Sequence, residues 1–346
     1  MALFATFHFY GVGNSGCGED FIVRRLASVE LCAGVGGLAL GLERAGFDPL
    51  LLVDNDPHSC ATLRTNRPAW RVVQADLRAF DVTEHPEVVG VDLMASGIPA
   101  APFAAAGRQY GTADDRDLLG TVVALTERMT PRAILIETTP NLFTSVKFAE
   151  TQKWLAVEFE RMGYRWDHAI LDARDFGVPQ NRRSAFVVAF RQDVSAVFAW
   201  PVGEGEALTV GQVLRESMGG RGWAWVDEWA VKADRPAPTI VGGSRKHGGP
   251  DLGPTRTKKA WLELGVNASS LGNEVPGPDD TLGDSRQEMP KLTVGQVKLL
   301  QGLPEEWAVS GGKTASYRQV AQAVPPPVAT AVGEQLAMAL AVQADV

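Results

Sequence analysis

A glycine-rich turn and two acidic residues are spaced as in a site for a nucleotide-like ligand. The turn reads Cys32-Ala33-Gly34-Val35-Gly36-Gly37, between an apolar run and a helical pattern. Glycines let backbone amides approach a ligand, and a helix N-terminus favours negative charge. Asp54 follows about twenty residues later, where a carboxylate can accept from both ribose hydroxyls; Asp76 could accept from an adenine amino group. A tight turn without a ligand would show the same glycines.

Glu137 directly follows the apolar run 133–136. A carboxylate at the C-terminal end of a strand in an open α/β sheet lies at the usual ligand-binding edge, which favours a site role over a surface carboxylate. Further along, the segment 235–259 is rich in Arg and Lys, with Asp251 as its one acidic residue. Such a run is typical either of a solvated surface or of a segment that contacts phosphates.

The elements that must position these residues alternate between strand and helix patterns. Expected strands are 29–32, 49–53, 71–74, 91–95 and 133–136, and expected helices are 38–45, 57–66, 118–129, 148–162, 293–300 and 325–338. A hairpin of 168–172 with 184–190 is also expected. This alternation predicts an α/β fold with a parallel, doubly wound sheet.

The composition changes along the chain and predicts its domains. Residues 1–27 form an N-terminal extension, 28–192 the main domain, 193–290 a smaller domain and 291–346 a return to the main domain. The small domain is rich in Gly and Pro and lacks a long helical or strand period. Its Trp223, Trp225 and Trp229 are expected in its core, since short domains need large apolar side chains.

The overall composition is that of a globular protein. The 346 residues are 45% hydrophobic and 21% charged, with a net charge of −8, which argues against nonspecific coating of nucleic acid but leaves room for a local basic face. No apolar run is long enough for a membrane helix, and no basic signal start is seen, so a cytoplasmic location is expected. Cys17, Cys32 and Cys60 lack disulfide or metal-ligand spacing, so no metal is expected.

The stretch E-L-C-A-G-V-G-G-L-A-L-G-L-E-R-A-G-F, residues 30–47, resembles the first motif of DNA cytosine-5 methyltransferases. Asp54 and Asp76 match the second and third motifs, and the likeness continues to about Gly333. The resemblance implies a class I S-adenosylmethionine-dependent, Rossmann-like fold with a target-recognition domain at 193–290. It implies that S-adenosylmethionine, or S-adenosylhomocysteine, is bound by Leu31, Ala33, Gly34, Gly36, Gly37, Leu38, Asp54, Asn55, Asp76, Leu77, Gln322 and Ala323.

The catalytic loop of the family, G-P-P-C-Q-P-F-S, is matched by residues 97–107, with Ala100 where the family keeps its nucleophilic cysteine. In the family the thiolate adds to C6 of a flipped-out cytosine, a glutamate meets N3, and C5 then attacks the methyl group. Alanine offers no lone pair. Glu137 matches the glutamate and Arg182 the first arginine of Q-x-R-x-R, whereas Ser184 replaces the second.

Departures also occur at Thr138, Gly295, Gln296, Ala321 and Gln322. A spread over several motifs favours natural loss of catalysis, giving a pseudoenzyme with a regulatory or DNA-binding role. The alternatives are an active restriction-modification enzyme whose cysteine has been replaced, and an enzyme that uses Glu137 for other base chemistry. Double-stranded DNA is the expected partner, besides a protein partner if the chain is regulatory, and the expected DNA contacts are Arg245, Lys246 and Arg256.

Overall fold

The computed structural model describes residues 25–99, 103, 117–203, 205–241 and 249–341. Within them a seven-stranded sheet has the order β3-β2-β1-β4-β5-β7-β6. The first five strands run parallel, and β7 is antiparallel to both β5 and β6. The predicted doubly wound sheet and hairpin are confirmed. The strands are β1 (Leu26–Leu31), β2 (Phe47–Asp54), β3 (Val72–Gln74), β4 (Leu93–Gly97), β5 (Ala133–Thr138), β6 (Tyr164–Asp172) and β7 (Arg183–Arg191).

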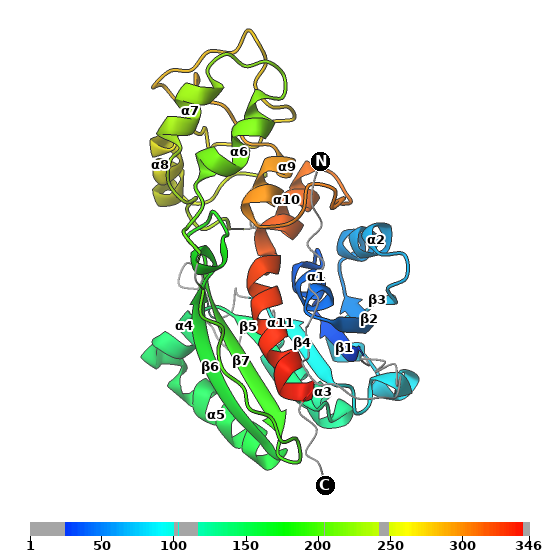
Figure 1. Ribbon diagram of the computed structural model, residues 1–346. Coiled ribbons are helices and arrows are strands. Elements are labelled where there is room, and N and C mark those ends of the chain that lie inside the picture. Colours follow the sequence, from blue (N-terminus) through cyan, green and yellow to red (C-terminus); the bar gives the residue numbers. More distant parts are fainter. Residues whose placement is uncertain (1–24, 100–102, 104–116, 204, 242–248, 342–346) are drawn as a thin grey trace, which may run out of the picture.

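Helices cover both faces of this sheet (Figure 1). One face carries α3 (Leu119–Met129) and α5 (Ala149–Arg161), and the other carries α1 (Gly37–Arg44) and α11 (Pro326–Ala341). Because both faces are covered, all six residues of the interior strand β5 are buried. The remaining elements of this part are α2 (Pro57–Asn66), α4 (Asn141–Thr144) and the 3₁₀ turns η1 (Leu77–Ala79), η2 (Val82–Glu84), η3 (Pro86–Val88), η5 (Val146–Phe148) and η6 (Ala173–Phe176).

The helix α2 shows why the sequence starts and ends its elements where it does. The Asp56 carboxylate accepts from the Ser59 amide at 3.1 Å, and Pro57 occupies the first helical position, where its missing N–H costs no hydrogen bond. These two signals place α2 at the predicted residues 57–66.

Helices α1 and α11 pack unusually closely because glycines line their contact. A Cβ atom built on Gly41 would lie 2.3 Å from the Ala329 Cβ, and one on Gly37 would lie 2.2 Å from the Val324 carbonyl oxygen. A larger residue at Gly41 would force the helices apart, and one at Gly37 would displace the segment just before α11. The C-terminal return therefore lies directly against the helix that follows the glycine-rich turn.

The small domain contains short helices that the sequence pattern did not reveal. They are α6 (Val210–Gly219), α7 (Val226–Lys232) and α8 (Thr255–Glu263), which lie at one end of the molecule, beyond α9 (Val294–Leu300) and α10 (Lys313–Gln322) (Figure 1). Trp223 and Trp229 are buried as predicted. The prediction for Trp225 was wrong: this residue, just before α7, is 41% exposed and lies outside the buried cluster that contains Trp223 and Trp229.

The start of the segment 193–290 packs on the sheet. Val194, Phe198 and Trp200 join the cluster between the sheet and α11, and the Trp200 indole donates to the Asp167 carboxylate at 2.8 Å. In the described residues, no helix combines the length and apolar character that a bilayer span requires.

Candidate functional site

The glycine-rich turn connects β1 to α1 and depends on backbone conformations that favour glycine. Gly34 and Gly36 have φ of 54° and 89°, and a Cβ on Gly36 would lie 2.6 Å from the Leu63 Cδ2 atom. Trp307, from the C-terminal return, supports the turn: its indole nitrogen donates to the Val35 carbonyl at 3.0 Å. Sequence analysis missed Trp307, since nothing in its neighbourhood marks a contact with a turn so distant along the chain.

Asp54, at the end of β2, is held in place by the turn. Its Oδ2 accepts from the Gly34 amide at 2.8 Å and its Oδ1 from the Asp56 amide at 2.8 Å. Each carboxylate oxygen has a second lone pair, so both can accept one further hydrogen bond, as a ribose diol requires. Burial raises the pKa of Asp54, an effect that hydrogen bonds from the Asp56, Gly34 and Asn55 amides oppose.

Asp76 follows β3, the strand next to β2, and so lies at the same edge of the sheet. Its carboxylate is about half exposed and accepts from the Arg78 amide at 3.0 Å, capping η1. Of the other predicted cofactor residues, Ala33, Leu77 and Ala323 are buried and Asn55 and Gln322 are exposed. Leu31 and Leu38 belong to the hydrophobic core, so their side chains are not available to a ligand.

Beneath the turn lies a buried carboxyl group that sequence analysis did not single out. Glu30 is 3% exposed, and its Oε2 atom has no partner among the described residues. Burial, followed by the charge of Asp54, raises the pKa of Glu30 well above its usual value. The unpartnered Glu30 atom and the remaining lone pairs of Asp54 can hydrogen-bond to a polar ligand.

Glu137 lies near the end of β5, where its carboxyl group is 8% exposed. In the β5–β7 register Glu137 is opposite Phe186, so Ser184, two residues away, shares its face of the sheet. The Ser184 hydroxyl is hydrogen-bonded to the Glu137 carboxyl group. Burial raises the pKa of Glu137, and the Arg182 charge and the Ser184 hydrogen bond oppose that rise. Ser184 therefore stands where the family motif has an arginine and is also a partner of Glu137.

Arg182 is partly buried and makes contacts beyond the sheet. One terminal nitrogen donates to the carbonyls of Ile240, at 3.3 Å, and Ala321, at 3.2 Å. Its Nε atom is buried and has no partner among the described residues. Arg182 thus links the sheet to the small domain and the return, with donor capacity remaining next to Glu137.

Ala100 lies outside the described residues, but Ile98 and Phe103 on either side of it are described. The Ile98 amide donates to the Glu137 carbonyl at 3.1 Å, and Gly97 pairs with Glu137 across β4 and β5. Phe103 is fully buried, and its carbonyl accepts from the Asn141 side chain at 2.6 Å. Ile98 and Phe103, the described residues nearest to Ala100, therefore contact the chain at and just after Glu137.

With this geometry established, comparison with known proteins is decisive. The model of the C-5 cytosine-specific DNA methylase family matches residues 26–338. The chain belongs to this family. The predicted family and cofactor class, S-adenosylmethionine, are thereby confirmed, whereas the individual binding residues remain predictions.

The chain aligns with most of the length of each of the following relatives. Type II methyltransferase M.NaeI of Lentzea aerocolonigenes is 43% identical over 324 residues, covering 93% of this chain and 77% of that protein. Type II methyltransferase M.NgoMIV of Neisseria gonorrhoeae is 36% identical over 320 residues, covering 91% and 98%. Among solved structures, a Spodoptera frugiperda DNMT2 mutant has a TM-score of 0.63 at 13% identity, covering 90% and 99%, which supports the methyltransferase fold.

Of the three predicted DNA contacts of this methylase homologue, one lies among the described residues. Arg245 and Lys246 lie outside the described residues. Arg256 is exposed in the first turn of α8, whereas Lys258, on the same helix, pairs with Asp251 at 2.9 Å.

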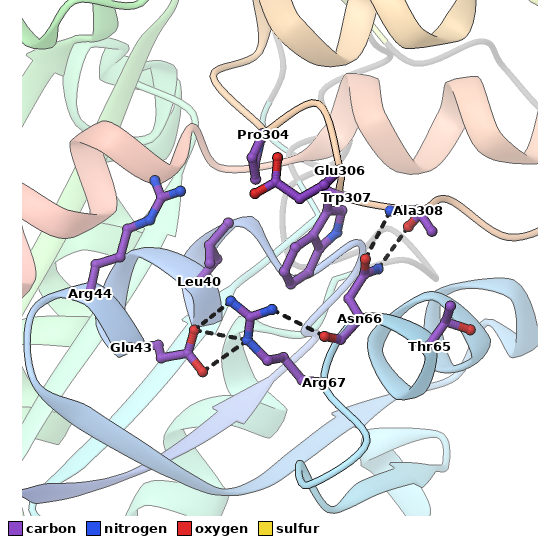
Figure 2. A pocket seen from close by; sticks show the side chains of 10 residues that line it. All are labelled: Leu40, Glu43, Arg44, Thr65, Asn66, Arg67, Pro304, Glu306, Trp307 and Ala308. Carbon is purple, nitrogen blue, oxygen red and sulfur yellow. Dashed lines mark hydrogen bonds and ion pairs between the residues drawn. The ribbon is translucent and has the colours of Figure 1, made fainter. Parts of the chain in front are cut away.

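A hollow of about 380 Å³ lies on the outer side of α1 and does not coincide with the predicted cofactor site. Figure 2 shows its lining, with the Arg67 guanidinium paired to Glu43 and lying near the ring of Trp307. None of the predicted cofactor residues lines it. Trp307 therefore contacts the glycine-rich turn and also lines this hollow.

Proposed function

We propose that this chain is a cytosine-5 methyltransferase homologue that holds S-adenosylmethionine or S-adenosylhomocysteine and binds duplex DNA without transferring the methyl group. The recognition domain of this proposal is 193–290, and the proposed setting is the cytoplasm. The role is that of a DNA-binding or regulatory protein.

The observation that carries the proposal is Ala100 at the position of the nucleophile. C5 of cytosine is too weak a nucleophile to attack a methyl group until a thiolate has added to C6. The described cysteines do not supply that thiolate, because burial raises the pKa of Cys32 to about 12 and that of Cys60 to about 11. Both remain neutral thiols near neutral pH.

The cofactor edge supports retained binding. Asp54 has a lone pair left for a ribose hydroxyl, Asp76 lies at the same sheet edge, and the Glu30 carboxyl group below the turn has an unpartnered oxygen for a polar ligand group. When bound, S-adenosylmethionine would offer an electrophilic methyl group on its sulfonium. Glu137 and Arg182 would meet the Watson–Crick edge of a flipped base through a carboxyl group and guanidinium donors.

Methyl transfer to duplex DNA tests the proposal. We would compare the unaltered chain, its Ala100→Cys variant and the M.NgoMIV relative, using radiolabelled cofactor. The unaltered chain is expected to be silent, and 5-methylcytosine formed by it would overturn the proposal. Activity on restoring the cysteine would indicate an active enzyme whose nucleophile was replaced. Silence of the Ala100→Cys variant would support loss of catalysis at further positions.

Calorimetric titration with S-adenosylmethionine and a duplex-binding assay test the two retained activities separately. Both are expected to give measurable affinity in the unaltered chain. Absence of cofactor binding would remove this proposal and the active-enzyme alternative together.

A further inference from the structure

Two fully buried glutamines form a side-chain pair between parts of the chain that are far apart in sequence. Gln180 precedes β7, Gln301 follows α9, and both are 0% exposed. The Gln180 Nε2 donates to the Gln301 Oε1 at 2.6 Å. A buried amide is tolerated only if its donors and acceptor are satisfied, so the partners of this pair reveal what it holds together.

Every side-chain polar atom of the pair has a partner, and these partners belong to three parts of the molecule. The Gln180 Oε1 accepts from the Ile240 amide of the small domain at 2.9 Å, and its Nε2 also donates to the Leu300 carbonyl at 3.3 Å. The Gln301 Nε2 donates to the Ala323 carbonyl at 2.5 Å. The pair thus joins the sheet domain, the small domain and the C-terminal return.

Backbone contacts concentrate at the same place. Gln180 forms a parallel bridge with Ala237, in which the Asn181 amide donates to the Ala237 carbonyl at 2.7 Å and the Ala237 amide donates to Pro179 at 2.8 Å. Arg182, beside Glu137, reaches the Ile240 carbonyl. The small domain is therefore fixed to the sheet domain within a few residues of the candidate base pocket.

We infer that the Gln180–Gln301 pair sets the orientation of the small domain over the Glu137 pocket, and that Gln180 is a positioning residue for DNA binding. The DNA part of this inference rests on the proposed function. The orientation part does not, since it follows from the contacts alone.

The pair requires a group at position 180 that both accepts and donates. A glutamate in place of Gln180 would still accept from the Ile240 amide, but its ionised form has no hydrogen to give to the Gln301 Oε1, and two oxygens would then face each other. A protonated glutamate would restore the donor. Burial favours the protonated form of a carboxyl group, so the defect of Gln180→Glu should be reversible with acid.

Gln319→Glu provides a matched control. Gln319 is also buried, and its amide accepts from the Thr62 hydroxyl at 2.7 Å and donates to the Ser310 carbonyl at 2.7 Å. Its side chain links α10 to α2, and among the described residues none of its hydrogen-bond partners belongs to the small domain. The substitution therefore removes a comparable buried donor without touching the small-domain attachment.

The experiment measures duplex affinity by fluorescence anisotropy for Gln180→Glu and Gln319→Glu, each relative to the unaltered full chain at about pH 9.5 and about pH 5.5, on either side of the range of about 7–9 in which a fully buried carboxyl group titrates. Gln180→Glu is expected to bind duplex about tenfold more weakly at the higher pH, as expected for one lost buried hydrogen bond, and to recover at the lower. Its affinity for S-adenosylmethionine should remain near that of the unaltered chain, and Gln319→Glu should bind duplex normally at both pH values.

Small-angle scattering of the DNA-free proteins provides an independent readout. At the higher pH, Gln180→Glu should have a larger radius of gyration than the unaltered chain, and the difference should disappear at the lower pH. Unchanged scattering together with unchanged duplex affinity would overturn the inference, as would an equal loss in Gln319→Glu. If the unaltered chain failed to bind duplex at all, the proposed function would fail, and scattering alone would decide the orientation role.

Discussion

The predicted cofactor edge and the predicted base pocket of this methylase homologue keep the family's residues to different extents. At the cofactor edge, the glycines of the turn and the carboxylates Asp54 and Asp76 match the family pattern, and Ala321 and Gln322 depart from it. The turn is also held by contacts with Asp54 and Trp307. At the base pocket, Ala100 and Ser184 replace residues that the family uses for chemistry. The first region depends on backbone shape that the whole fold maintains, whereas the second depends on single side chains that can be lost without unfolding the sheet.

The largest effect is expected for Trp307→Ala, which would remove the contact between the glycine-rich turn and the C-terminal return. Trp307 is 2% exposed and hydrogen-bonds to Val35, so its removal should lower the free energy of unfolding by about 3–5 kcal/mol. Urea denaturation would measure this loss. Trp225→Ala, at the 41% exposed tryptophan, should change stability by less than about 1 kcal/mol; equal losses would show that Trp307 is not a special support.

Asp54→Ala should abolish most cofactor binding while leaving the sheet intact. The substitution leaves the Gly34 and Asp56 amides without their acceptor and removes the ribose acceptors. We expect affinity for S-adenosylmethionine to fall by about 100-fold, equivalent to about 3 kcal/mol, as measured by calorimetry. Asp48→Ala, at an exposed position on the same strand, is the control, and a similar loss there would argue against a specific role for Asp54.

Glu30→Gln should change how stability depends on pH. The pKa of Glu30 is raised in the folded protein, so the folded state binds a proton more tightly than the unfolded state does. The stability that this proton provides is complete below the ordinary value of 4.5 and is lost as pH rises towards the raised pKa. Denaturant midpoints across this window should fall with pH in the unaltered chain and fall less in Glu30→Gln; parallel curves would contradict the assignment.

The smallest effect is expected for Ser184→Ala, which removes one hydrogen bond from Glu137. Stability should fall by at most about 1 kcal/mol, and the pKa of Glu137 should rise further, because the hydroxyl now lowers it. Carboxyl-selective NMR titration would detect the rise. An unchanged pKa of Glu137 would show that Ser184 does not act on it.

The sheet could be predicted closely from the sequence because each strand and helix has its own local signal. The apolar run 133–136 and the Asp56–Pro57 start of α2 are examples, and both elements lie where predicted or extend by a few residues. In the small domain the helices α6, α7 and α8 are short, and their burial depends on tryptophans whose direction is set by tertiary packing, so periodicity could not reveal them.

The candidate site divides in the same way. Asp54, Asp76 and Glu137 could be found because each ends or follows a recognisable strand. The roles of Trp307, Glu30 and the Gln180–Gln301 pair could not, since they depend on partners far away in sequence; the two glutamines are 121 positions apart. Contacts of this kind become visible only when the folded chain is described.

The close contact of α11 with α1 has a consequence for shortened forms of this protein. Gly41 of α1 lies against Ala329 of α11, and Gly37 lies against Val324 just before α11, so α11 covers one side of α1. A premature stop codon upstream of α11 would leave every strand of the sheet encoded. The product would nevertheless lack the helix against which α1, and with it the glycine-rich turn, packs. We expect such a truncated product to lose its small-molecule affinity even where translation has supplied all the residues that touch the ligand.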